Sequence, residues 1–521
     1  MKNLFLVGLI CLSTWHSLAQ EKVTIPAKDI LIGRNLRSNT DINARKYVFP
    51  GEIQQWHMND STDKLILQLQ ESRNDSMPTL AGKEAADMGT IIQYDLKSQQ
   101  IQWSRNINYA QTNIDPYDRA LIKSTPDFSS YLDSNTGVDV WSARSAICYV
   151  NSTRGIAVGI KTSKDGNLSN TYEGYNLKTG ELLWRRNINR DYNVNGISNL
   201  NDSTIVISAN GLHAIHLKTG LGWDYDAHTG TKDYSSTVAA NLINVGFSLM
   251  LGTDPEITTG HDLITDVVSN TLIDSTGIYM ADKKSVVQLN HYGNVLWKNN
   301  LPRDMVSRSS LFRKDSLIYM VADGFASRNN ESIHYGKPFI ACYHIDSGKR
   351  LFLSKVGYKN EQILSYEIQQ DTICLLSKNK IFRYSLRDGS EIWEKHFKTD
   401  SLGELTRFGD SDMFIRSDSG AFSPVRSSPA SLVVFTNKNQ LLVLNNLLDI
   451  NTIIPNDRIF LCYLETKDYK FMDMGEATLV TDKNNRPIAQ LDISGNAVLF
   501  GTKLFESSGN SLIEIDMNEF R

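Results

Sequence analysis

The chain has 521 residues, of which 41% are hydrophobic, 21% are charged and 9% are aromatic, a composition typical of a globular protein with a large core. Its 54 Lys and Arg residues nearly balance its 58 Asp and Glu residues. The resulting net charge of −4 argues against a nucleic-acid-binding protein and against a polybasic protein of membrane surfaces. With 33 Gly and 12 Pro residues, the chain is neither collagen-like nor of low complexity.

The segment 1–19 is predicted to be a signal peptide. Its apolar run, Leu4 to Leu12, is too short to span a bilayer as a helix, and Ser17 and Ala19 are small residues at the positions that a signal peptidase reads. A lipoprotein signal ending at Cys11 is disfavoured because a bulky isoleucine precedes that cysteine. We therefore expect an exported protein of the periplasm or the extracellular space, with no transmembrane segment in the mature chain.

A hairpin motif recurs along the rest of the chain. In most copies a strand leads into a tight turn ending in glycine, and a second strand ends in a large aromatic residue four positions past that glycine, or three in the Trp223 copy. Glycine supplies the positive φ that a tight hairpin with a bulge needs. The aromatic positions are Trp103, Trp184, Trp223, Trp297, Phe352 and Trp393, and the turn glycines are Gly180, Gly220, Gly293, Gly348, Gly389 and Gly495. A ligand site would not repeat with every unit, so these aromatic residues are predicted to pack the units together.

A second mark, an Asp or Asn beside a Ser or Thr in most copies, precedes an apolar strand in each unit. Eight such marks lie between Asp60 and Asp457, at a mean spacing of about 57 residues, which fits four strands with longer loops. The series predicts an all-β fold, a β-propeller of four-stranded blades that forms a single domain over 20–521. The marks favour eight blades, with seven as the alternative. The segment 22–32 is expected to add a strand to the last blade and close the ring.

The pattern that ends in Gly-x-x-x-Trp, clearest at 177–184 and 385–393, resembles the tryptophan-docking repeat of quinoprotein-like (PQQ-repeat) β-propellers. The resemblance covers about 60–500. In that family the Trp ring wedges between neighbouring blades, near the turn glycine of the adjacent copy. The resemblance implies the same structural role for the aromatic positions and glycines named above.

The family contains quinone- and calcium-dependent dehydrogenases and a non-catalytic branch. This chain has no adjacent cysteine pair, no compact acidic calcium loop and none of the common hydrolase, metalloprotease or nucleotide-binding motifs. It is similar to the non-catalytic branch, that of the periplasmic outer-membrane assembly propeller, which binds protein partners. We therefore expect a non-enzymatic protein with no catalytic residues, cofactor or metal. The alternatives are a PQQ- and calcium-dependent dehydrogenase and a carbohydrate-binding propeller.

Two segments exceed the repeat and are predicted to be long loop insertions: 105–146, which contains Trp141, and 224–270. Long loops on a rigid scaffold are where binding residues usually lie. The second insertion supplies a candidate binding loop for a sugar, a metal or a peptide, formed by Asp224, Tyr225, Asp226 and His228. The predicted function is a binding scaffold whose loop face takes a protein partner or a small ligand in the cell envelope, and no nucleic acid.

Overall fold

The computed structural model describes most of the chain. The described ranges are 23–59, 63–71, 88–117, 120–190, 194, 196–233, 262–329, 331–357, 361–397, 402–406, 413–416, 422–424, 432–436, 440–444, 450–455 and 458–521. The predicted signal peptide and residues 234–261 of the second predicted insertion lie outside the described residues.

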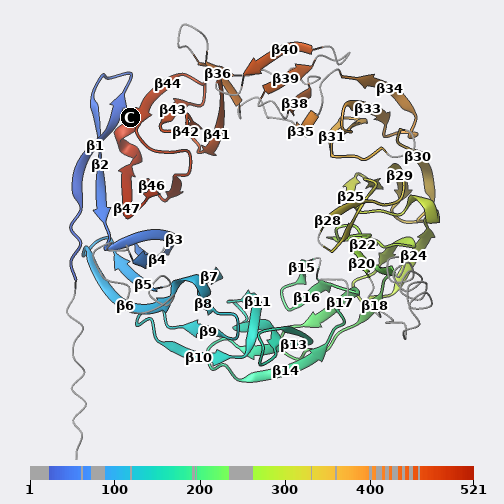
Figure 1. Cartoon of the computed structure of the whole chain (residues 1–521), viewed down its shortest axis with the longest axis horizontal. Coiled ribbons are helices and arrows are strands. Elements are labelled where there is room, and N and C mark those ends of the chain that lie inside the picture. The colour runs from blue at the N-terminus through green and yellow to red at the C-terminus, as the bar shows by residue number, and fades with distance from the viewer. Residues whose placement is uncertain are drawn as a thin grey trace, which may run out of the picture.

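The described residues form strands, with no α-helix and three short 3-10 helices, η2 (Tyr109–Gln111), η3 (Arg303–Met305) and η5 (Met517–Phe520). No described helix is long and apolar enough to cross a membrane. Four-stranded antiparallel units follow one another around a ring (Figure 1). We number these units in chain order, beginning with the strand that follows the N-terminal hairpin.

The first four units contain only consecutive strands. They are unit 1, β3 (Gly51–Asn59), β4 (Lys64–Glu71), β5 (Met88–Asp95) and β6 (Gln100–Asn108); unit 2, β7 (Asn113–Tyr117), β8 (Ala120–Ser124), β9 (Ser129–Leu132) and β10 (Asp139–Ala143); unit 3, β11 (Ser145–Asn151), β12 (Ile156–Thr162), β13 (Leu168–Asn176) and β14 (Leu182–Asn187); and unit 4, β15 (Gly196–Asn201), β16 (Thr204–Ser208), β17 (Gly211–His216) and β18 (Asp224–Asp226).

Two of the next four units carry an inserted pair of strands. They are unit 5, β21 (Leu272–Asp274), β22 (Gly277–Ala281), β23 (Ser285–Leu289) and β24 (Val295–Asn300); unit 6, β25 (Ser309–Lys314), β26 (Leu317–Ala322), β29 (Phe339–His344) and β30 (Arg350–Lys355); unit 7, β31 (Ser365–Gln369), β32 (Thr372–Leu376), β33 (Lys380–Ser385) and β34 (Glu391–His396); and unit 8, β35 (Leu402–Thr406), β38 (Leu432–Thr436), β39 (Gln440–Leu444) and β40 (Ile450–Pro455). The pair inserted in unit 8, β36 (Met413–Arg416) and β37 (Phe422–Pro424), joins the next unit through β41.

The ring is closed by the N-terminal hairpin, β1 (Lys28–Asn35) and β2 (Asp41–Val48). Unit 9 consists of β41 (Ile459–Glu465), β42 (Tyr469–Asp473), β43 (Thr478–Asp482) and β44 (Pro487–Leu491); unit 10 consists of β45 (Val498–Phe500), β46 (Lys503–Ser508), β47 (Ser511–Asp516) and β2. β2 pairs with β47, and β1 pairs with β44, so units 9 and 10 share one 11-stranded sheet. The N-terminus does close the ring, but the strand given to the last unit is β2 and not the predicted segment 22–32, whose end lies in β1.

Ten units are present in the described part of the chain, so the predicted count of eight is not confirmed. One reason is that 105–146 is not a loop insertion: it contains all four strands of unit 2, and Trp141 lies on its outer strand. Gly495 is a second correction. It lies between β44 and β45, outside any hairpin turn, and it is not among the glycines with positive φ.

The middle strands of a unit are buried on both faces because units pack face to face around the ring. All residues of β22 and β23 are buried, which explains their continuous apolar sequences. The outer strand β24 buries one side chain, that of Trp297. At the turn before such an outer strand, Gly180 has φ of 71° and the strand pairing shifts by a bulge at Gly174 and Tyr175, which is the predicted hairpin geometry. In unit 1, Gln99 takes the glycine position with φ of 55°.

An accessory sheet interrupts the repeat. It consists of β19 (Thr231–Asp233) and β20 (Asp262–Thr265), from the chain between units 4 and 5, and β27 (Phe325–Arg328) and β28 (Glu331–His334), inserted in unit 6. β20 pairs with β27, so two segments far apart in sequence form one sheet. Ile264 and Ala326 bury their side chains in the core that units 5 and 6 share. Figure 1 shows β28 toward the inner side of the ring.

Candidate functional site

Six docking aromatic residues of the described ranges lie against the turn glycine of the next unit. A Cβ atom added to Gly180, Gly220 or Gly348 would lie within 3 Å of ring atoms of Trp141, Trp184 or Trp297, respectively. The same relation joins Gly137 to Trp103, Gly293 to Trp223 and Gly389 to Phe352. Glycine is therefore required at these turns for two reasons: the positive φ, and the absence of a side chain where the ring packs.

The indole nitrogens add a hydrogen bond to this packing. In four copies Nε1 donates to the carbonyl oxygen three residues before the docking glycine: Trp103 to Ser134 at 3.0 Å, and Trp141, Trp184 and Trp297 to Leu177, Leu217 and Ile345 at 2.7 Å. Trp223 donates to the His291 carbonyl at 3.0 Å. The four buried indoles, those of Trp103, Trp141, Trp184 and Trp297, thus have the polar partner that they need.

A third contact, which the sequence analysis missed, comes from the residue two positions after the docking tryptophan. Arg105 Nε and Arg186 NH1 donate to the carbonyls of Gly137 and Gly220 at 3.2 and 3.3 Å, and Asn299 Nδ2 donates to that of Gly348 at 2.6 Å. The glycine therefore receives a ring on its Cα and a donor on its oxygen. We call this combination the inter-unit latch.

Asp224 does not lie on a loop. It begins β18, the outer strand of unit 4, where its Oδ1 is 2.6 Å from His213 Nδ1 and 2.7 Å from Arg186 NH2. Burial alone would raise the pKa of Asp224, but the hydrogen bond from His213 and the charge of Arg186 outweigh it and hold the pKa below its ordinary value. The opposite nitrogen of His213, Nε2, is buried with no hydrogen-bond partner.

The other three residues of the predicted binding loop contact different neighbours. The Tyr225 ring lies 5.7 Å from Lys298 Nζ, and the exposed Asp226 pairs with Gly211 in the sheet. His228 has its backbone N–H on Asp282 and its Nε2 2.6 Å from Lys284 Nζ. The four residues therefore do not converge on one site. Nor does any group of three or more His, Cys, Asp or Glu residues in the described ranges have the arrangement of a metal site.

The accessory sheet is anchored at the start of β27. The ring of His334 stacks on the ring of Phe325, with the ring centroids 6.4 Å apart and the planes at 12° to each other. The guanidinium of Arg308 lies 5.5 Å from the centre of the Phe325 ring. Arg308 also forms an ion pair of 2.7 Å with Asp323. Burial raises the pKa of Asp323 above its ordinary value in spite of this partner. The hairpin β27–β28 is thereby fixed to unit 6.

These features define a β-propeller, as the sequence predicts. No family model matches the chain, and no curated protein does. Among solved structures, the chain is similar to BamB from Moraxella catarrhalis, with 10% identity and a TM-score of 0.33 over 73% of this chain and 96% of that one. It is also similar to a eukaryotic initiation factor, with 8% identity and a TM-score of 0.35 over 94% of this chain and 98% of that one. A third similar structure is the C-terminal WD40 domain of Sif2, with 8% identity and a TM-score of 0.28 over 78% of this chain and 95% of that one. At such low identities and scores, an argument about function has to come from the residues of this chain.

Proposed function

We propose that the protein is an exported, non-enzymatic propeller that binds a protein partner in the cell envelope through its accessory sheet. The observation that supports this most is the origin of that sheet. It is built from two insertions that occur once, whereas the latches recur from unit to unit. A recognition surface is expected where a rigid repeat scaffold departs from its own pattern.

The geometry of β28 suits an extended partner segment. β28 is an edge strand of the accessory sheet, and within the described ranges no strand pairs with its outer side. Glu331, Ser332 and His334 are exposed on it, while the contacts of Phe325 and Arg308 hold the hairpin in place. An edge strand with unpaired backbone groups can accept a strand from another protein, with main-chain hydrogen bonds giving affinity and alternate side chains giving specificity.

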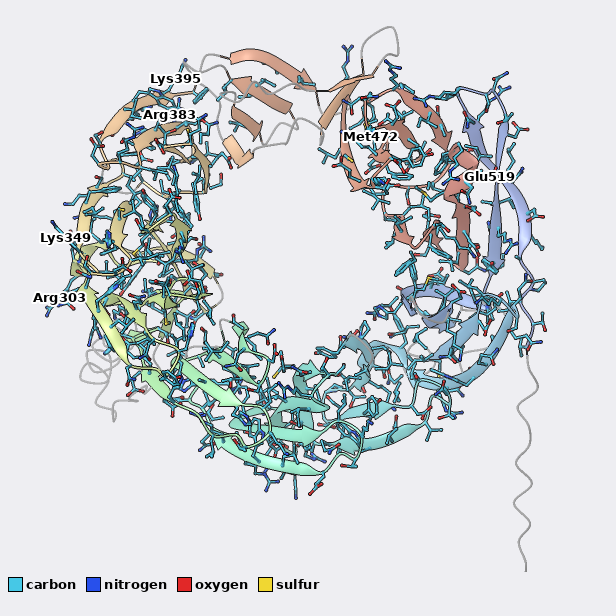
Figure 2. All side chains as sticks on the ribbon, turned by 180° about the vertical axis from the view of Figure 1, so that it is seen from behind. Arg303, Lys349, Arg383, Lys395, Met472 and Glu519 are labelled. Atoms are coloured by element: carbon cyan, nitrogen blue, oxygen red, sulfur yellow. The ribbon has the colours of Figure 1, made fainter. Side chains whose placement is uncertain are left out.

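Site-specific photo-crosslinking tests the proposal. A benzophenone side chain placed at Ser332 should give a discrete adduct with one envelope protein. The same group at Lys349, an exposed turn residue of the same unit at the outer rim (Figure 2), should not. Replacing Glu331 and Ser332 together by proline removes the main-chain N–H groups of these two β28 residues and keeps the buried Ala326 of β27; it should abolish binding of the captured protein without lowering the melting temperature by more than a few degrees. Equal adducts from both positions would contradict the proposal.

The enzymatic alternative has its own test. Calorimetric titration of the protein with pyrroloquinoline quinone and calcium is expected to show no saturable binding, and a dye-linked assay on alcohols and sugars is expected to show no turnover. Tight binding with turnover would replace this proposal by a quinoprotein dehydrogenase.

A further inference from the structure

A pocket lies at the junction of units 1 and 2. Its volume is about 290 Å³, close to the lower limit for small-molecule sites. Its lining combines apolar residues, among them Trp103, Leu132 and Val138, with the charged residues Arg105, Lys123 and Asp139.

The Arg105 side chain distinguishes this junction from the next comparable one. Arg186 occupies the same latch position as Arg105, and its guanidinium is neutralised by Asp224 at 2.7 Å. Arg105 donates instead to three backbone carbonyls, those of Gly137, Thr136 and Ser104, and no carboxylate of the described residues forms an ion pair with it. A guanidinium carries five N–H donors, so two remain for a further acceptor.

The second cation of the pocket is already neutralised. Lys123 Nζ lies 2.7 Å from both carboxylate oxygens of Asp139. The pocket lining therefore has a net charge of one positive unit, from the half-buried Arg105 beside an apolar wall. This arrangement complements a single negative charge on an apolar body, and it would repel a cation.

We propose that this pocket binds a small monocarboxylate with an apolar or aromatic body. The carboxylate accepts from the two remaining donors of Arg105, and the apolar body packs on Leu132, Val138 and the Trp103 ring. The proposal is independent of partner binding at the accessory sheet, because the pocket lies in units 1 and 2 and the accessory sheet is attached to units 5 and 6.

Fluorine NMR titration of the protein with 3-(4-fluorophenyl)propionate tests the proposal. We expect saturable line broadening with a Kd of about 1 mM or tighter, given the size of the probe. The neutral isostere 3-(4-fluorophenyl)propanamide should bind at least about tenfold more weakly, because it cannot make the charge-assisted hydrogen bonds.

Matched variants separate the pocket from the latch. Arg105→Gln should weaken propionate binding at least about tenfold, while Arg186→Gln, which removes the equivalent latch donor, should leave it unchanged. Val138→Phe keeps the net charge of the pocket but fills it with a larger side chain at an exposed position, so it should abolish propionate binding. Melting temperatures of the three variants identify any loss caused by unfolding. The proposal is wrong if the amide binds as well as the acid, if the two arginine variants behave alike, or if the folded protein shows no binding at about 10 mM probe.

Discussion

Trp184 of unit 3 packs its ring directly against Gly220 of unit 4. The indole of Trp184 occupies the space where a side chain at position 220 would lie, and its Nε1 donates to the Leu217 carbonyl three residues earlier. Gly220 is held at φ of 71°, so the turn that leads to the outer strand of unit 4 is shaped to receive a ring from unit 3. A chain of such pairs fixes the angle between successive units, and a change at one turn should therefore weaken a junction and not only a hairpin.

Substitution of the docking glycine measures this coupling. Gly220→Ala would place Cβ 2.7 Å from the Trp184 ring in a left-handed conformation, and we expect a loss of about 2–4 kcal/mol in the free energy of unfolding. Gly155→Ala is the matched control, because Gly155 has φ of 66° with no atom within 4 Å of the added Cβ. It should cost about 1 kcal/mol, from backbone strain alone. Urea unfolding followed by tryptophan fluorescence compares the two. Equal losses would mean that the ring contact adds nothing.

The hairpin turns and docking residues are predictable from sequence because both depend on a fixed local spacing. The same spacing joins Gly137 to Trp141, but Trp141 follows Trp103 by only 38 residues, since the strands of unit 2 are four or five residues long. A period averaged over the chain therefore assigns that unit to a loop.

The candidate site is less predictable, for a physical reason. β20 pairs with β27, about sixty residues later, and no local pattern encodes such a pairing. The cluster Asp224, Tyr225, Asp226 and His228 was wrongly predicted to form a binding loop. Its mixture of polar and aromatic residues is typical of a binding loop, but Asp224 is used to pair Arg186 and His213 at the edge of unit 4.

A substitution of Trp223 distinguishes a packing role of this residue from a role in carbohydrate binding. Its ring lies on Gly293 and its Nε1 donates to the His291 carbonyl, so one ring face and the polar atom are occupied by unit 5. Trp223→Ala should lower the free energy of unfolding by about 2–4 kcal/mol. Glycan-array binding should be absent for both the parent protein and the variant. Glycan binding by the parent that disappears in a variant of unchanged stability would favour the carbohydrate-binding alternative.

An exposed ion-pair group joins units 6 and 7. Asp371 accepts from Lys314 at 2.6 Å and from Arg387 at 2.8 Å, and these hydrogen bonds lower the pKa of Asp371 from 3.8 to about 2. Because the folded-state pKa is depressed, the stabilisation is present above pH 4 and is lost as the pH falls from 4 to 2.

The Asp371→Asn variant should therefore melt slightly below the parent at pH 7, and the difference should disappear near pH 2. The effect should be small and should shrink with added salt, since the carboxylate is at the surface. Lys314→Met should reproduce part of it. A difference in melting temperature that persists unchanged at pH 2 would show that Asp371 acts by packing and not by charge.

A buried side-chain hydrogen bond joins β2 to β47, the strand pair that closes the ring. Tyr47 on β2 donates its hydroxyl to Glu514 Oε2 on β47 at 2.6 Å, and Lys503 Nζ lies 2.6 Å from the other oxygen of the same carboxylate. Burial, followed by the hydrogen bond and charge of Glu514, raises the pKa of Tyr47, so the phenol stays protonated and remains a donor. Tyr47→Phe would leave the buried carboxylate with one partner fewer, at a cost of about 1–3 kcal/mol.

We expect this loss to appear first as opening of the closure. Hydrogen exchange of 41–48 should accelerate in Tyr47→Phe, and the N-terminal hairpin should become sensitive to protease before the other units. Tyr463→Phe provides the control, because it removes a hydroxyl contact to Thr478 within unit 9 while keeping the closing strand pairs. It should leave exchange of 41–48 unchanged. If both variants instead exchange uniformly faster in all units, then β2 and β47 do not open as a separate step, and the ring unfolds without a preferred point of rupture.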